Sequence, residues 1–189
     1  MSENPLVLSL ARLPRALGST RHEDVSWIVP DDLGTPSMAV APGSVLDVSV
    51  DMTSIDDGVL VQLATSVDLE GECVRCLDEV RRHHEVTSSE VYCEPGAPAL
   101  SAQGEDETQS QDLFMIGERD TISIETQLRD AIVPLADPRP LCRPDCEGLC
   151  DVCGEKWAEL PADHEHFVVD PRLASLASLL GDSPEPERS

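Results

Sequence analysis

Basic residues are scarce in this chain of 189 residues, where 13 Lys and Arg stand against 37 Asp and Glu and the formal charge is −24. A protein that holds nucleic acid by broad phosphate neutralisation needs Lys and Arg to displace counterions, and an acidic field repels phosphate. The composition therefore excludes extensive RNA or DNA binding.

Aromatic side chains are also few, at 3% of the chain, although the hydrophobic fraction is 40%. A core built mainly from Val, Leu, Ile and Ala lacks the large side chains that dominate burial. We expect one domain, over residues 1–180, in which something besides apolar burial helps to hold the fold.

Long hydrophobic runs are missing as well. No stretch approaches the roughly 18 apolar residues that a membrane span needs, and the short run at residues 6–10 is wrongly flanked for a signal peptide. We expect a cytoplasmic protein, in which Cys-x-x-Cys pairs indicate metal binding or redox chemistry before disulfides.

Residues 44–93 alternate between apolar and polar side chains and predict an antiparallel meander. The first strand begins near Leu46, and a hairpin turn follows at residues 56–58, where Gly58 is expected to supply a positive φ. A second strand runs from Val59, and a third from about Val80 to residue 93. The tip between them carries a Cys-x-x-Cys pair at residues 73–76.

Helical spacing of apolar residues predicts a helix over residues 122–136, with Ser123 as its cap, lying on the sheet. A second short helix is expected over residues 170–180, with Asp170 as its cap. Residues 95–112 contain no Lys or Arg and few large apolar residues, so this acidic loop and the tail at 181–189 are predicted to be disordered. The fold class is α+β.

Residues 138–169 are loop-like and rich in potential metal ligands. Zinc takes four Cys or His ligands, so eight ligands make two tetrahedral sites. The most local set is formed from Cys150, Cys153, His164 and His166. By elimination, the hairpin tip then joins the segment after the first helix in a second set, formed from Cys73, Cys76, Cys142 and Cys146. Cys93 is left over.

Another partition of these ligands stays open. A single ion held by Cys142, Cys146, Cys150 and Cys153 would leave the hairpin pair and the histidines free. The hairpin cysteines would then be small apolar residues at a strand end, and the histidines would be exposed loop residues.

Two catalytic interpretations of the cysteines find little support. Cys146, Cys150 and Cys153 have the spacing of the radical-SAM cluster motif, but Val152 stands where that family usually has an aromatic residue. A thioredoxin-like role for residues 73–76 requires a strand that feeds a helix, whereas here a second strand follows. No Gly-rich phosphate loop or nucleophile elbow is present, so we predict no catalytic residue.

The stretch from residue 141 to 154, Leu-Cys-Arg-Pro-Asp-Cys-Glu-Gly-Leu-Cys-Asp-Val-Cys-Gly, resembles the YceD family of large ribosomal RNA subunit accumulation proteins. The element Glu-Cys-Val-Arg-Cys-Leu at residues 72–77 is similar to the other signature of that family, and the resemblance covers residues 45–180. Many relatives have Cys-x-Cys where this chain has His164-Glu165-His166, so the chain keeps zinc-competent atoms there.

The resemblance implies a non-enzymatic role in the accumulation or processing of large-subunit ribosomal RNA. The partner would be the precursor of the large subunit or a basic ribosomal protein, which an acidic surface attracts. Any RNA contact would be confined to a patch of Arg75, Arg81 and Arg82 at the hairpin tip. The alternatives are a metal-dependent RNA-processing enzyme and a thiol-based, zinc-containing redox sensor.

Overall fold

The computed structural model describes residues 4–96 and 114–166, and the chain divides into two compact units, residues 1–146 and 147–189. The single domain predicted over residues 1–180 stays a prediction. The predicted helix at 170–180, the tail at 181–189 and most of the acidic loop at 95–112 lie outside the described residues. No helix in the described ranges is long and apolar enough to cross a membrane.

The first unit contains a seven-stranded sheet, which is antiparallel apart from one short parallel pair, and a separate two-stranded antiparallel sheet. Its strands are β1 (Val7–Ser9), β2 (Thr20–Ile28), β3 (Gly34–Thr35), β4 (Met38–Val40), β5 (Val45–Ile55), β6 (Gly58–Glu72), β7 (Glu79–Cys93), β8 (Phe114–Met115) and β9 (Thr121–Ser123). Its helices are η1 (Leu10–Arg12), α2 (Glu125–Ile132) and η3 (Val133–Leu135), and the second unit contains η4 (Trp157–Glu159).

The meander predicted for residues 44–93 is confirmed as β5, β6 and β7. The main sheet has the order β2-β5-β6-β4-β3, and β7 pairs with β6 along its whole length. Strict alternation points one row of side chains inward, because successive residues of a strand face opposite sides. The apolar residues of the inner row on β5 and β6 are almost fully buried, as are Val80, Val86 and Tyr92 on β7.

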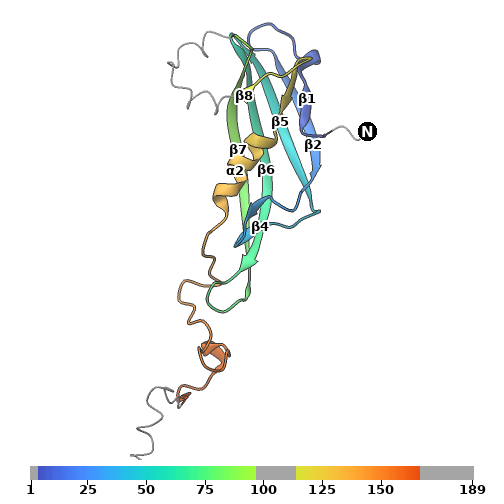
Figure 1. Cartoon of the computed structure of the whole chain (residues 1–189). Helices are drawn as coiled ribbons and strands as arrows, with labels where there is room; N and C mark the ends of the chain where they lie inside the picture. The colour runs from blue at the N-terminus through green and yellow to red at the C-terminus, as the bar shows by residue number, and fades with distance from the viewer. Residues whose placement is uncertain (1–3, 97–113, 167–189) are drawn as a thin grey trace, which may run out of the picture. The chain divides into compact units, whose positions relative to one another are not determined.

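The predicted covering helix is also present, and Figure 1 shows α2 lying across β6 and β7. Its buried residues Leu128 and Ile132 are wholly inaccessible to solvent, as is Ile124 just before it. The helix spans only Glu125–Ile132, and Ser123 is not its cap, because Thr121–Ser123 forms a strand that pairs with β1. A long-range strand pairing thus replaces the expected first turn.

Gly58 serves a different purpose from the one predicted. It is the first residue of β6 and does not have a positive φ. The turn consists of the two residues before it, because Ile55 pairs directly with Gly58. A Cβ atom at residue 58 would lie 2.0 Å from the carbonyl oxygen of Tyr92. Glycine is required here because β7 approaches closely, not because of the turn conformation.

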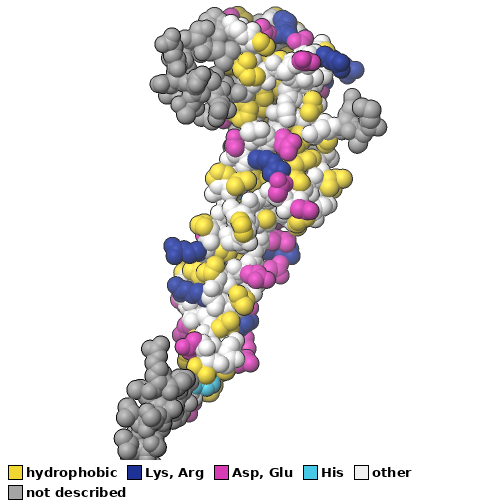
Figure 2. All heavy atoms as spheres, in the orientation of Figure 1, with side chains coloured by type: hydrophobic (Ala, Val, Ile, Leu, Met, Phe, Trp, Pro, Cys, Tyr) yellow, Lys and Arg dark blue, Asp and Glu magenta, His cyan; other side chains and the backbone are white. Residues whose placement is uncertain are grey.

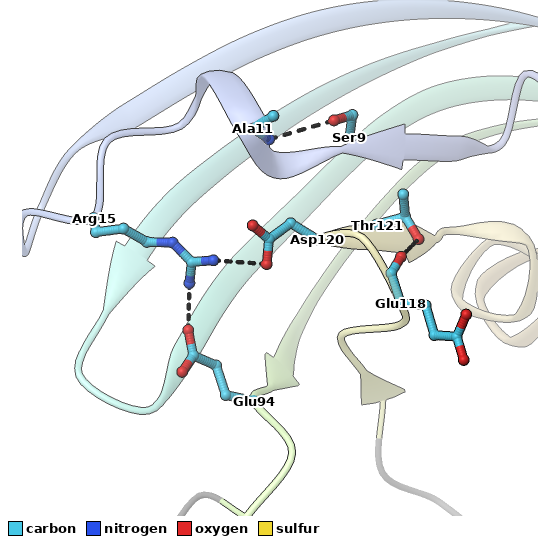
Figure 3. A network of polar contacts seen from close by, with 7 residues as sticks. All are labelled: Ser9, Ala11, Arg15, Glu94, Glu118, Asp120 and Thr121. Carbon is cyan, nitrogen blue, oxygen red and sulfur yellow. Dashed lines mark hydrogen bonds and ion pairs between the residues drawn. The ribbon is translucent and has the colours of Figure 1, made fainter.

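The N-terminal segment covers part of the core, a role that the sequence patterns did not indicate. Leu6, Leu8 and Leu10 are buried around β1, which pairs with β9. Figure 3 shows how Arg15 ties this segment to two others: its guanidinium contacts the carboxylates of Glu94 and of Asp120, the latter at 2.8 Å.

Gln127 is the one polar side chain of α2 that is wholly buried, and we expect its replacement by leucine to lower the free energy of unfolding by about 2 kcal/mol. Its Nε2 donates to the carbonyl of Val61 at 3.1 Å, and its Oε1 accepts from the Tyr92 hydroxyl at 3.2 Å. Urea denaturation of the wild-type protein and the variant measures this difference in the free energy of unfolding. The exposed Gln62→Leu variant is the control, and an equal effect of both substitutions would contradict the assignment.

Candidate metal centres

The first ligand set joins the tip of the β6–β7 hairpin to the segment that follows α2. Cys73 and Cys76 lie in the turn between these strands, and Cys142 and Cys146 come from residues 140–146. The backbone N–H of Val74 donates to the carbonyl of Pro140 at 2.9 Å, which docks this segment on the turn. Cys73, Cys76 and Cys146 are buried, and Cys142 is half-buried.

The sulfur atoms of this set have the spacing of a tetrahedral zinc site. All four lie within 4.8 Å of one another, with 3.8 Å between Cys73 and Cys146 and 3.5 Å between Cys76 and Cys142. Zinc–sulfur bonds of about 2.3 Å place the sulfur atoms of a tetrahedron about 3.8 Å apart. The four thiols therefore fit a closed, four-coordinate zinc site.

Backbone amides of the turn also favour a thiolate. Burial acts to raise the pKa of Cys73, but N–H donors from Cys142, Arg75 and Cys76 outweigh it and lower the pKa to about 6. The pKa of Cys76 is raised instead: the N–H of Asp78 lowers it, but burial and the neighbouring thiols have the larger combined effect. Four neighbouring thiols cannot all lose their protons without a cation, because the thiolates would repel one another. A divalent cation offsets this repulsion.

Two of the three arginines predicted to contact a partner donate hydrogen bonds to the backbone of this segment. Arg82 Nη2 donates to the carbonyl of Leu141 at 2.8 Å, and Arg75 Nη1 donates to the carbonyl of Cys146 at 2.7 Å. Arg81 forms ion pairs with Glu70 at 3.3 Å and Glu79 at 2.6 Å. Arg75 and Arg82 thus bind the backbone of the segment that carries Cys142 and Cys146.

An Arg82→Met variant is therefore expected to bind zinc at this set about tenfold more weakly, because supporting hydrogen bonds orient metal ligands. Methionine keeps an apolar stem and removes the donor to Leu141. Competition with a chromogenic chelator measures the affinity. The neighbouring Arg81→Met variant is the control, and equal affinities for both variants would contradict the role of Arg82.

The second ligand set lies within the second unit and spans only residues 150–166. Cys150, Cys153, His164 and His166 bring their ligand atoms within 4.8 Å of one another, and Cys153 Sγ is 3.6 Å from His164 Nε2. Zinc bonds of about 2.3 Å to sulfur and about 2.1 Å to nitrogen give a ligand separation of about 3.6 Å. This set also fits a closed tetrahedral site.

The accessibility of the second set is greater than that of the first. Cys150 is buried and its pKa is lowered by the backbone N–H groups of Cys153 and Val152, but Cys153 and His166 are exposed. The ring of His164 packs edge-on against those of His166 and Trp157, at centroid distances of 4.4 and 5.5 Å. Short-range loop structure rather than a sheet holds these ligands.

Both groupings agree with the sequence analysis, which predicts the second set from its local spacing and the first set by elimination. The alternative quartet from Cys142 to Cys153 would take two ligands from each unit, and it stays a prediction. Cys93 is buried at the end of β7 and belongs to neither set. The supporting arginines could not be found by motif, because their partners are backbone carbonyls 59 and 71 residues away.

The fold and the ligand sets define a small α+β protein in which each of two Cys-x-x-Cys turns belongs to a set of four potential metal ligands. Residues 61–180 match the family model of the large ribosomal RNA subunit accumulation protein YceD, and the chain belongs to that family.

The chain is similar to several mycobacterial proteins. The uncharacterized protein Rv2926c of Mycobacterium tuberculosis and the uncharacterized protein Mb2951c of Mycobacterium bovis are each 33% identical over 178 residues, which is 94% of this chain and 83% of theirs. The uncharacterized protein ML1660 of Mycobacterium leprae is 30% identical over 153 residues, which is 78% of this chain and 65% of its own. No solved structure matches the chain.

Proposed function

We propose that this protein is a non-enzymatic assembly factor of the large ribosomal subunit that binds a basic ribosomal protein or the precursor particle. Membership of the YceD family gives the coarse role in ribosomal RNA accumulation. The proposal includes a cytoplasmic location, because ribosomal subunits are assembled there.

The observation that carries the proposal is the acidic outer face of the main sheet. Asp24, Asp47 and Glu85 line an open groove of about 500 Å³ on β2, β5, β6 and β7, among small side chains such as Ser49 and Ala64. Figure 2 presents the opposite face, which α2 covers and where acidic and basic side chains are interspersed, whereas the only charged side chains that line the groove are acidic. Such a field attracts basic protein and repels phosphate, so it steers association with a ribosomal protein before RNA.

Two histidines on the same face add a dependence on pH. The hydrogen bonds that His22 donates to Asp51 and that His83 donates to Asp68 are the leading causes that raise the pKa of each imidazole. Protonation therefore occurs at a higher pH than for an isolated histidine and adds positive charge to this face as the pH falls.

We further propose that each ligand set holds one zinc ion with a structural role. A set of four protein ligands completes the tetrahedral shell and leaves no position open for water or substrate, in contrast to catalytic zinc sites. Metal analysis of protein purified without chelator should give two zinc ions per chain. One ion would support the alternative quartet, and none would contradict both arrangements.

Pull-down of tagged protein from growing cells in low salt tests the proposed partners, and it should recover precursor particles or basic large-subunit proteins. A variant with Asp24→Asn, Asp47→Asn and Glu85→Gln should recover less. The control carries the same change of charge elsewhere, as Asp31→Asn, Asp56→Asn and Glu118→Gln. Recovery of neither class of partner by the wild-type protein would contradict the proposal.

RNA contact is proposed to stay limited to the remaining donors of Arg75, Arg81 and Arg82. Incubation of the purified protein with precursor RNA, with and without divalent metal, separates binding from processing, because cleavage would indicate an enzyme. The exposure of Cys153 favours one second candidate, a zinc-thiolate redox sensor. That candidate predicts zinc release by peroxide at sub-millimolar doses, whereas zinc that is retained would count against it.

A further inference from the structure

The two Cys-x-x-Cys turns share one backbone arrangement. The N–H of Leu77 donates to the carbonyl of Cys73 at 2.9 Å, and the N–H of Gly154 donates to the carbonyl of Cys150 at 2.8 Å. In each turn the N–H of the first cysteine donates to the carbonyl five residues later, at 2.7 Å. Leu77 and Gly154 therefore occupy equivalent positions.

Both positions require the left-handed conformation, with φ of +63° at Leu77 and +75° at Gly154. Glycine adopts it without steric penalty, but a leucine Cβ crowds the neighbouring backbone. The side chain of Leu77 is 62% exposed, so contacts within the chain do little to offset this strain. A strained, exposed apolar residue at a position that glycine fills equally well indicates a role outside the chain.

The surroundings of Leu77 form a groove of about 370 Å³. Its walls come from the β3–β4 turn and from the end of β6, and Val74, which is 50% exposed, lies beside Leu77. The apolar lining includes Pro36, Met38 and Ala39, and the charged lining consists of Glu70 and Glu72, with no Lys or Arg. Glu70 pairs with Arg81, but Glu72 is exposed and makes no ion pair within the described ranges.

We propose that Leu77 and Val74 are the docking point for a basic segment of a large-subunit ribosomal protein. An apolar side chain of the segment packs in the groove against Leu77, and a flanking Lys or Arg meets Glu72. This inference rests on the proposed function and names the surface that serves it. The groove disfavours RNA, because its charged lining consists of two carboxylates, of which Arg81 neutralises only Glu70.

The substitution Leu77→Gly separates a partner contact from a structural role. It removes the strain, so the melting temperature of the zinc-loaded protein should rise by about 2 to 4 °C while the zinc content stays the same. It also removes a buried anchor of the complex, so the affinity for total protein extracted from large ribosomal subunits should fall about tenfold. The measurement is capture of that protein mixture over a range of concentrations.

Leu17→Gly is the matched control, since Leu17 is 65% exposed and has no positive φ. This control should keep wild-type affinity and should not gain stability. Unchanged capture by Leu77→Gly, beside capture by the wild-type protein, would overturn the docking point and leave the proposed function intact.

Other outcomes are equally decisive. A lower melting temperature for Leu77→Gly would mean that Leu77 supports the fold, and it would overturn the inference. Wild-type binding to protein-free ribosomal RNA that Leu77→Gly loses would assign the groove to nucleic acid and overturn the proposed occupant. Failure of the wild-type protein to capture any large-subunit protein would instead refute the proposed function, and the docking point with it.

Discussion

A Cys146→Ser variant should retain about one zinc ion per chain in place of two and should lose much of the stability of the first unit. Cys146 is 3% exposed, and it joins the segment after α2 to the β6–β7 turn across 73 residues of chain. A structural zinc site contributes its binding energy to folding, because the unfolded chain holds no preformed site. A thousandfold loss of zinc affinity corresponds to about 4 kcal/mol in the free energy of unfolding.

Metal analysis and urea denaturation at a fixed free zinc concentration measure the two effects. Cys93→Ala is the control, because Cys93 is buried to a similar degree, at 4% exposed, but lies outside both ligand sets. It should keep two zinc ions and lose only the packing of one sulfur. If Cys146→Ser and Cys93→Ala changed stability and zinc content equally, residues 73–146 would hold no structural zinc.

The meander, the Cys-x-x-Cys turns and the second ligand set could be predicted because their signals are local, and the first set then followed by elimination. Alternation along β5 and β6 follows from one buried face, and a Cys-x-x-Cys turn delivers two ligands to one point whatever surrounds it. The position of residues 73–76 at a hairpin tip then follows from the strands on either side. Short-range geometry is what the order of residue types encodes directly.

The N-terminal third was harder to predict because its pattern is mixed. On β2, Arg21 and Glu23 lie on the same side of the strand as the buried Val25 and Trp27. These two positions hold an ion pair where apolar residues would be expected on the inner row. Alternation is therefore hidden in the first half of the strand. The burial of Leu6, Leu8 and Leu10 depends on β9, which lies more than 100 residues away in the sequence. No local pattern predicts the pairing of β1 with β9.

The arginine contacts that hold the first ligand set could not be predicted, for a related reason. Arginines at a hairpin tip beside a metal site suggest phosphate contact, since nothing in the sequence reveals a carbonyl as the partner. The structure gives Arg75 and Arg82 such partners at Cys146 and Leu141. Side-chain contacts to backbone depend on how distant segments dock, which is a property of the fold and not of a motif.

The two ligand sets should lose zinc at rates that differ by about a hundredfold, with the second set the faster. Residues 150–166 form a short loop in which Cys153 and His166 are exposed, so a local opening suffices to expose the ion. The first set combines a long hairpin with a segment held by Arg75 and Arg82. Release there requires that both elements separate, which has a larger opening free energy.

Mixing the zinc-loaded protein with excess chromogenic chelator should therefore give two phases of equal amplitude. Cys150→Ser should remove the fast phase alone, and Cys146→Ser should remove the slow phase alone, which assigns each phase to its ligands. A single phase, or a fast phase abolished by Cys146→Ser, would contradict the argument from burial. The expected order means that limited chelation leaves the hairpin site loaded, so partner binding at Leu77 can be measured in protein that has lost only the second ion.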